Sequence, residues 1–165
     1  MYERLIREYP DFPKKGINFK DISPLLADEQ VFRSALVDMG KQVRMPDVWC
    51  GIDSRGYLFS SGLATYFGGG IVCARKEGKT PGVCVTETYD LEYGTATLEL
   101  QPTDMKNEVV IVDDVLATGG TLMAVNKLAE RAGYEVVGNV VLVDLKYVPR
   151  VEGFDLNVKS VIKYD

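Results

Sequence analysis

The chain contains 165 residues, of which 46% are hydrophobic and 26% charged, and it carries a net charge of −5 with no histidine. This composition is typical of a globular protein, and residues 1–165 are predicted to form a single domain. The absence of histidine excludes Ser-His-Asp triads, Cys-His pairs and His-based metal sites, and the negative charge argues against a general nucleic-acid-binding protein.

The N-terminal quarter is predicted to combine a short helix, a loop and a longer helix. Apolar residues at positions 2, 5, 6 and 9 follow one face of a helix that Pro10 is expected to end. Residues 10–24 place further helix breakers between aromatic residues, which indicates an ordered loop. From Asp28, which suits an N-cap, apolar residues recur with the period of a helix and predict one that ends by Pro46.

The middle of the chain alternates between strand and helix patterns. Residues 47–52 (DVWCGI) predict a buried strand, which is followed by a helix to about Phe67 and a second strand at 70–74. The stretch 76–101 interrupts this pattern with glycines and a proline among polar residues. It predicts a flexible active-site loop or a β-ribbon outside the main sheet.

The second half continues the alternation. The apolar run 109–112 predicts a strand covered on both faces, 122–132 a helix closed by Gly133, and 136–145 another strand. The alternating run 156–162 predicts an edge strand. Repeated strand, turn and helix units indicate an α/β fold with an open, mostly parallel, twisted sheet and helices on both faces.

The sequence also bears on the cellular compartment. No stretch approaches the roughly 20 apolar residues that span a bilayer, and the charged residues in 1–8 do not fit a signal peptide. The three cysteines form no CxxC pair, so neither a disulfide framework nor a zinc site is indicated. We therefore expect a cytoplasmic protein with no membrane partner.

The most specific motif is 109–121, VVIVDDVLATGGT, in which a buried strand leads through a turn directly into a helix. Gly119 and Gly120 permit positive φ and close backbone approach, while the N–H groups at the helix start attract an anion. Thr118 and Thr121 add hydroxyl donors. The motif predicts a phosphate-binding turn, and it is neither a Walker A loop nor GxGxxG.

Two adjacent acids precede this turn. Asp113 and Asp114 lie at the carboxyl end of the predicted strand, where open α/β sheets bind their ligands. Together they can accept hydrogen bonds from two sugar hydroxyls. The alternative is that Asp113 only caps a turn that the glycines make tight.

The motif resembles the PRPP motif of type I phosphoribosyltransferases, which consists of apolar residues, two acids, an apolar pair and A-T-G-G-T. The resemblance implies that fold, with a small N-terminal hood region that includes the base-pocket segment 1–27. It implies that Asp113 and Asp114 bind the ribose hydroxyls and act in catalysis, and that PRPP itself carries the Mg²⁺, with no metal ligand from the protein. The residues implied to bind PRPP around the turn are Val112, Asp113, Asp114, Ala117, Thr118, Gly119, Gly120 and Thr121.

Two further segments are similar to adenine phosphoribosyltransferases and imply a base pocket. In 9–26 (YPDFPKKGINFKDISPLL), the backbone of Asn18 would read the purine edge and Phe19 would stack on its face. In 51–59 (GIDSRGYLF), Ser54 and Arg55 would bind pyrophosphate. Arg55 would also lie near the base and act in catalysis, and Leu116 is assigned to the base pocket as well.

Two more segments resemble the same family. In 74–82 (ARKEGKTPG), a small basic cluster would contact PRPP phosphates, partly across a homodimer interface, although a solvated charged face is the alternative. In 89–94 (YDLEYG), Glu92 would handle a proton at the purine ring and Tyr93 would cover it as part of the hood. The basic cluster comprises Arg75, Lys76 and Lys79.

These resemblances imply a purine salvage enzyme that transfers the phosphoribosyl group of PRPP to adenine and releases AMP and pyrophosphate. Two alternatives stay open: a phosphoribosyltransferase for hypoxanthine, guanine or xanthine, and a PRPP-sensing regulator without catalysis. The chain departs from the family after Leu145, where KYVPRVEGFDL replaces L-x-G-R-x-x-L, and at Lys20, which is often Arg in relatives.

The role implied for Glu92 can be tested by substitution. We expect Glu92→Gln to slow turnover while leaving PRPP binding largely intact, because the amide no longer accepts a proton. Steady-state rates together with PRPP binding by calorimetry would measure both quantities. Unchanged turnover would remove Glu92 from the mechanism.

Overall fold

The computed structural model describes residues 2–91, 94–105 and 107–165. Within these ranges the elements follow in chain order: η1 (Tyr2–Leu5), β1 (Arg7–Pro10), β2 (Asn18–Asp21), α1 (Ser23–Ala27), α2 (Glu29–Gly40), β3 (Val48–Ile52), α3 (Gly56–Phe67), β4 (Gly70–Lys76), β5 (Val85–Leu91), β6 (Gly94–Leu100), β7 (Glu108–Leu116), α4 (Gly120–Arg131), β8 (Glu135–Leu145) and β9 (Val158–Tyr164).

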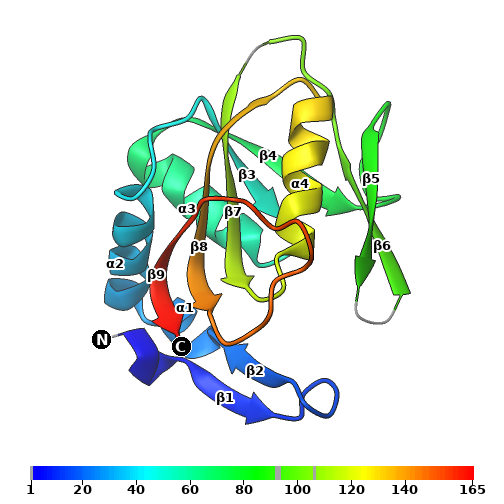
Figure 1. Cartoon of the computed structure of the whole chain (residues 1–165). Coiled ribbons are helices and arrows are strands. Elements are labelled where there is room, and N and C mark those ends of the chain that lie inside the picture. The colour runs from blue at the N-terminus through cyan, green and yellow to red at the C-terminus, as the bar shows by residue number, and fades with distance from the viewer. Residues whose placement is uncertain (1, 92–93, 106) are drawn as a thin grey trace.

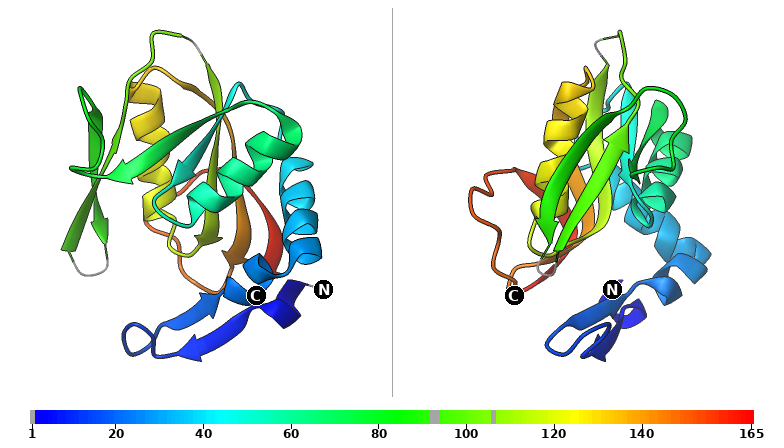
Figure 2. Two further views of the ribbon diagram at one scale, coloured as in Figure 1. Left: turned by 180° about the vertical axis from the view of Figure 1, so that it is seen from behind. Right: turned by 90° about the vertical axis from the view of Figure 1, so that its right-hand side faces the viewer.

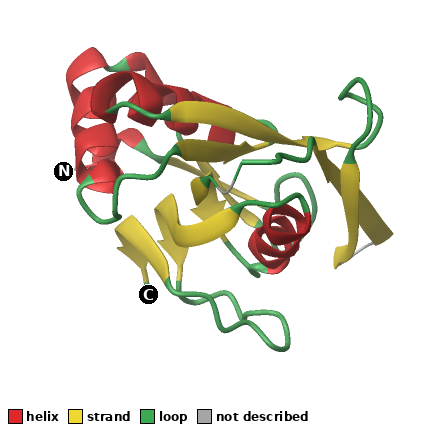
Figure 3. Ribbon diagram, turned by 90° about the horizontal axis from the view of Figure 1, so that it is seen from above, coloured by secondary structure: helices red, strands yellow, loops and turns green. Residues whose placement is uncertain are grey.

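A twisted sheet forms the centre of the molecule (Figure 1). In the described part of the chain it has seven strands in the order β5-β6-β4-β3-β7-β8-β9. The neighbours β4 and β3, β3 and β7, β7 and β8, and β8 and β9 are parallel. In contrast, β6 pairs antiparallel with β4 and with β5. The helices α2 and α3 cover one face and α4 the other (Figures 2 and 3). The predicted α/β class with a mostly parallel sheet is confirmed.

The strand β7 lies between β3 and β8 and contributes to the cores on both faces. Val110 and Val112 belong to the core under α2 and α3, while Val109 and Ile111 belong to the core under α4. All four side chains are fully buried. The near-continuous apolar run is therefore explained by a strand that has no face toward water.

The N-terminal segment differs from the prediction. The expected helix ends at Leu5 as a 3-10 turn, and Arg7–Pro10 is a strand that pairs antiparallel with β2. All four residues of β1 are exposed. The spacing of apolar residues therefore carried no information about the backbone pairing that decides the conformation of this strand. The segment 10–24, predicted as a loop, contains β2 and the start of α1, where Pro24 occupies the first turn without needing an N–H partner.

The segment 76–101 is also partly corrected. It contains the expected ribbon, β5 and β6, but this ribbon joins the main sheet because Arg75 pairs with Glu99 and Lys76 with Leu98. Leu98 and Leu100 are buried in the core under α4. Burial of these two leucines favours a position on the sheet edge over one in solvent.

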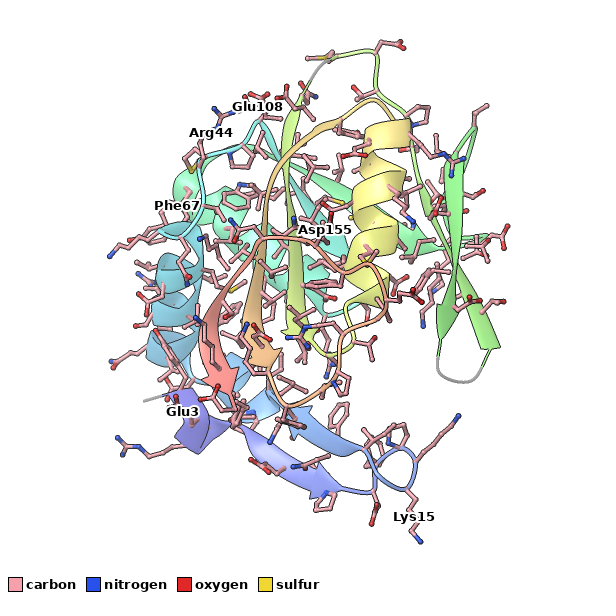
Figure 4. All side chains as sticks on the ribbon, in the orientation of Figure 1. Glu3, Lys15, Arg44, Phe67, Glu108 and Asp155 are labelled. Carbon is pink, nitrogen blue, oxygen red and sulfur yellow. The ribbon has the colours of Figure 1, made fainter. Side chains whose placement is uncertain are left out.

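The other elements lie close to their predicted positions. Asp28 caps α2 by accepting a 3.0 Å hydrogen bond from the Val31 N–H, and β9 is an edge strand parallel to β8. The helix α2 ends at Gly40, earlier than its apolar pattern suggested. A Cβ atom at Gly40 would lie 2.2 Å from the ring of Phe67, which is labelled in Figure 4, so the close contact between α2 and α3 requires glycine there.

The two ends of the sheet differ in chemistry. At the amino end of β7, Arg44 forms an ion pair with Glu108, and both side chains are labelled in Figure 4. The carboxyl ends of β3, β7 and β8 point toward the N-terminal hairpin of β1 and β2 (Figure 1).

None of the described helices is long and apolar enough to cross a membrane.

Candidate active site

The predicted site residues from β3, β4 and β7 come together at one edge of the sheet. These strands are parallel and adjacent, so Ser54, Lys76 and Asp114 lie near or just beyond their carboxyl ends on the same side. A cavity at this edge is lined by the following residues: Asp113, Val115, Leu116, Ala117, Thr118, Gly119, Thr121, Leu122 and Val141. Leu116, which was assigned to the base pocket, lines this cavity beside the turn.

The turn between β7 and α4, residues 117–121, is called the phosphate turn below. Gly119 has φ of 87°, and a Cβ atom there would lie 2.4 Å from the ring of Phe154. Both the backbone conformation and the close contact therefore require glycine. The Gly119 carbonyl accepts from the Met123 N–H at 3.0 Å, so α4 begins directly at the turn and directs its N-terminal dipole toward the cavity.

The acid pair occupies the carboxyl end of β7. Removal from water, reinforced by the charge of Asp114, raises the pKa of Asp113 well above its usual range. Burial likewise raises the pKa of Asp114, although the Arg55 guanidinium opposes this shift. Asp113 Oδ1 accepts a 2.9 Å hydrogen bond from the Asp114 N–H. Burial thus disfavours the charged forms of both acids, so a positive partner or hydroxyl donors are needed to stabilise the pair when it ionises.

Arg55 connects this acid pair with the N-terminal hairpin. Its Nε lies 2.7 Å from Asp114 Oδ2, and its guanidinium carbon is 5.2 Å from the centroid of the Phe19 ring. Phe12 packs edge-on against Phe19 with the ring centroids 5.2 Å apart. Arg55 precedes α3, and a Cβ atom at Gly56 would meet the Val112 carbonyl at 2.7 Å, so α3 begins tight against β7.

Asn18 and Lys20 point to the other side of β2 and share one partner on β1. Asn18 Nδ2 donates to Glu8 at 2.8 Å, and Lys20 Nζ lies 2.7 Å from the same carboxylate. Lys20 is 5% exposed and its Nζ is 4.3 Å from the centroid of the Tyr164 ring. Its ammonium therefore fastens the hairpin to β9.

The basic cluster is shaped by Asp53, which sequence analysis missed. Arg75 donates to the Lys79 carbonyl at 2.6 Å, while Asp53 Oδ2 lies 3.5 Å from Lys79 Nζ and 3.2 Å from the Lys76 N–H. Ser54, which follows Asp53, is exposed at the same edge. Because Asp53 follows β3, it brings the cluster to the carboxyl edge of the sheet.

Glu99 is a second organising acid that sequence analysis missed. It accepts hydrogen bonds of 3.0, 2.8 and 2.6 Å from the N–H groups of Gly78, Lys79 and Thr80. Burial acts to raise the pKa of Glu99, but these donors outweigh it and lower the pKa. The signal in the sequence was an acid between two leucines in β6, because all three side chains are buried.

The β5–β6 ribbon reaches the phosphate turn. The hydroxyl of Thr121 donates to the Tyr89 hydroxyl at 3.2 Å, so the start of the YDLEYG segment lies beside the turn. Glu92 and Tyr93, assigned to proton handling and to covering the base, lie outside the described residues.

Comparison with known proteins identifies the family to which the chain is similar. A family model described as phosphoribosyl transferase domain matches residues 29–161. The chain is 46% identical over 164 residues to an adenine phosphoribosyltransferase of Rhodospirillum rubrum, a match that covers 97% of this chain and 96% of that protein.

Solved structures are similar as well. The adenine phosphoribosyltransferase of Thermoanaerobacter pseudethanolicus is 40% identical with a TM-score of 0.90, and the match covers 99% of this chain and 98% of that one. The Saccharomyces cerevisiae adenine phosphoribosyltransferase, complexed with adenine and an imino-altritol bisphosphate, is 32% identical with a TM-score of 0.84. That match covers 96% of this chain and 95% of the yeast chain.

The raised pKa of Asp113 predicts a pH-dependent effect of Asp113→Asn on stability. An unfolded Asp ionises at about pH 4, whereas folded Asp113 ionises only at higher pH. Ionisation of Asp113 therefore opposes folding as the pH rises between these two pKa values. Asparagine does not ionise. We therefore expect the stability of the variant relative to the wild type to increase from about pH 4 to about pH 8.

Urea unfolding of both proteins at the two pH values measures this difference. Asp155→Asn, an acid-to-amide change at an exposed position, is the matched control for the substitution itself. If the free energies of unfolding of the wild type and Asp113→Asn differ by the same amount at both pH values, the raised pKa of Asp113 is contradicted.

Proposed function

The chain belongs to the adenine phosphoribosyltransferases of the phosphoribosyl transferase family, and we propose that it transfers the 5-phosphoribosyl group of PRPP to adenine, giving AMP and pyrophosphate. The observation that carries the proposal is Arg55, which contacts both Asp114 beside the phosphate turn and Phe19 on the hairpin. A sugar phosphate bound at the turn and a planar base bound at Phe19 would meet at this arginine.

The phosphate turn would bind the 5′-phosphate of PRPP. Its backbone N–H groups and the dipole of α4 favour an anion, and Thr118 and Thr121 supply hydroxyl donors. Asp113 and Asp114 would accept hydrogen bonds from the two ribose hydroxyls. Charge-assisted hydrogen bonds of this kind are about twice as strong as neutral ones, and they offset the burial of the acid pair.

The leaving pyrophosphate would be bound by Ser54, Arg55 and the basic cluster of Arg75, Lys76 and Lys79. Arg55 contacts Asp114 through Nε, and the guanidinium carries further N–H donors suited to phosphate oxygens. Mg²⁺ would arrive with PRPP, since this ion prefers oxygen ligands and binds through one or two carboxylates plus substrate phosphates. The ion would be held by the phosphate oxygens of PRPP with no ligand from the protein, and it would neutralise pyrophosphate charge.

Adenine would stack on Phe19, and the backbone at Asn18 would read its edge. Phe12 supports this ring from one side, and Arg55 faces it at 5.2 Å. Leu116 would contribute apolar surface at the inner end of the pocket. Backbone donors and acceptors on β2 can discriminate an amino group from a carbonyl oxygen on the purine because an unpaired buried group is costly.

The reaction would proceed by attack of a base nitrogen on C1 of the ribose as the bond to pyrophosphate breaks. Positive charge builds on the ribose ring, close to the acid pair, and no covalent enzyme intermediate is required. Glu92 would take the proton released by the base, and Tyr93 would help to exclude water. The hydrogen bond between Thr121 and Tyr89 supports a position of the β5–β6 ribbon over the substrate.

We further propose a single domain, residues 1–165, with the base pocket in 1–27 and an active-site loop in 76–101, that acts in the cytoplasm as a homodimer. Three exposed apolar side chains on α3 and β4 support contact with a second copy: Leu58, Tyr66 and Ile71, with 48%, 56% and 44% of their surface exposed. Exposed apolar side chains are stabilised when an interface removes them from water.

An assay of the purified protein tests the reaction and its specificity together. With PRPP, Mg²⁺ and each of adenine, hypoxanthine, guanine, xanthine and orotate, we expect nucleotide formation with adenine alone. Product with another base only would retain the PRPP site and overturn the base pocket. PRPP binding without any product would favour a PRPP-sensing regulator.

A pair of glycine substitutions tests the phosphate turn. Gly119→Ala would strain a positive φ and push a methyl group into the Phe154 ring at 2.4 Å, and we expect the KM for PRPP to rise about tenfold or more. Gly153→Ala is the matched control, because Gly153 also has positive φ but a Cβ atom there meets nothing within 4 Å. Equal effects of the two substitutions on the KM for PRPP would argue against the assignment.

A further inference from the structure

The segment between β8 and β9, residues 146–157, packs against the phosphate turn and is called the C-terminal segment here. It crosses β7 near the start of α4 (Figure 1), and Asp155, labelled in Figure 4, lies on it. The Val151 N–H donates to the Thr118 carbonyl at 2.9 Å, and Arg150 Nη1 donates to the Ala117 carbonyl. Two consecutive carbonyl groups of the turn are therefore bound from the same segment.

Arg150 is itself held from several sides. Its Nη2 pairs with Asp144, whose side chain is 1% exposed, and Nη1 also lies 3.0 Å from the Leu145 carbonyl and 3.2 Å from that of Val148. Its guanidinium carbon lies 5.8 Å from the centroid of the Phe154 ring, which covers Gly119. The two oxygens of Asp144 are divided between two cations: Oδ1 pairs with Arg150, and Oδ2 lies 2.7 Å from Lys146 Nζ. The ion pair with this buried carboxylate keeps the guanidinium in this position.

The geometry of the peptide group turns these contacts into an orientation of the turn amides. In a planar trans peptide the carbonyl of one residue and the N–H of the next point in opposite directions. When the carbonyls of Ala117 and Thr118 face the C-terminal segment, the N–H groups of Thr118 and Gly119 face away from it. Thr118 and Gly119 line the cavity, so that is the side on which an anion can bind.

We infer that Arg150 is a positioning residue that holds the amides of the phosphate turn toward the 5′-phosphate of PRPP. The inference rests on the proposed function for the identity of the anion. Without Arg150, the peptide between Ala117 and Thr118 is free to rotate and present its carbonyl oxygen to the phosphate, which repels it. The 5′-phosphate is not a reacting group, so the loss falls on PRPP affinity rather than on turnover.

The experiment compares the wild type with Arg150→Ala, Arg150→Lys and Arg131→Ala. Ribose 5-phosphate binding by calorimetry, without base or turnover, is the direct probe of the turn. It is accompanied by kcat, the KM values for PRPP and adenine, and the thermal midpoint. Arg131 is the matched control, because it also donates to a carbonyl and to a carboxylate, those of Thr86 and Glu87, but it ends α4 at the far side from the turn.

We expect Arg150→Ala to weaken ribose 5-phosphate binding and to raise the KM for PRPP by about tenfold each, with kcat and the KM for adenine changed by less than about twofold. Arg150→Lys should retain the thermal midpoint, because the ammonium still pairs with Asp144. It should nevertheless lose ribose 5-phosphate affinity, since one ammonium lacks the planar fork that spans Asp144 and Ala117. Arg131→Ala should leave sugar-phosphate affinity unchanged.

The Lys variant keeps the test valid if Arg150→Ala does not fold. Wild-type affinity for ribose 5-phosphate in a folded Arg150 variant, whatever its thermal midpoint, would overturn the inference and reduce Arg150 to a structural role. An equal loss in Arg131→Ala would overturn it as well. Failure of the wild type to bind ribose 5-phosphate would instead overturn the proposed PRPP site, so the two failures are distinguishable.

Discussion

The burial of β7 on both faces is the constraint on which the rest of the structure depends. Because β3 and β8 take its hydrogen bonds and helices cover both faces, its residues from Val109 to Val112 must be apolar. Beyond Val112 the strand changes from apolar to acidic residues near its carboxyl end. Asp113, Asp114 and the phosphate turn follow at that point, and α4 must start immediately in order to return along the sheet. One buried strand thus places acids, turn amides and a helix dipole at the same edge.

Ion pairs between acidic and basic side chains explain how a chain with a net charge of −5 can bind an anion. Three cations near the site are each oriented by a neighbouring carboxylate: Arg55 by Asp114, Lys79 by Asp53 and Arg150 by Asp144. Glu99 acts in the same way on backbone N–H groups. These contacts reduce the freedom of long side chains before a ligand binds, and local geometry rather than net charge then favours the phosphates.

Aromatic and ionic contacts attach the N-terminal hairpin to this frame. Lys20 is buried between Glu8 and the Tyr164 ring, so the hairpin is fastened to the last strand of the sheet. On the other side of β2, Phe19 faces Arg55 and thereby the acid pair. The hairpin can therefore present a stacking surface at a fixed place although it lies outside the main sheet.

The sequence by itself determined the features that depend on neighbours along the chain: the Asp28 cap, the helical and strand periods, and the motif in which two acids precede a glycine turn. These follow from turn chemistry and side-chain spacing within a few residues. Only the tertiary structure decided the pairing of β1 with β2, the attachment of the β5–β6 ribbon to β4, and the contact of Arg150 with Ala117, 33 residues away. The reason is physical, since the exposed residues of β1 and the C-terminal segment acquire their conformation from partners that the order of strands brings near.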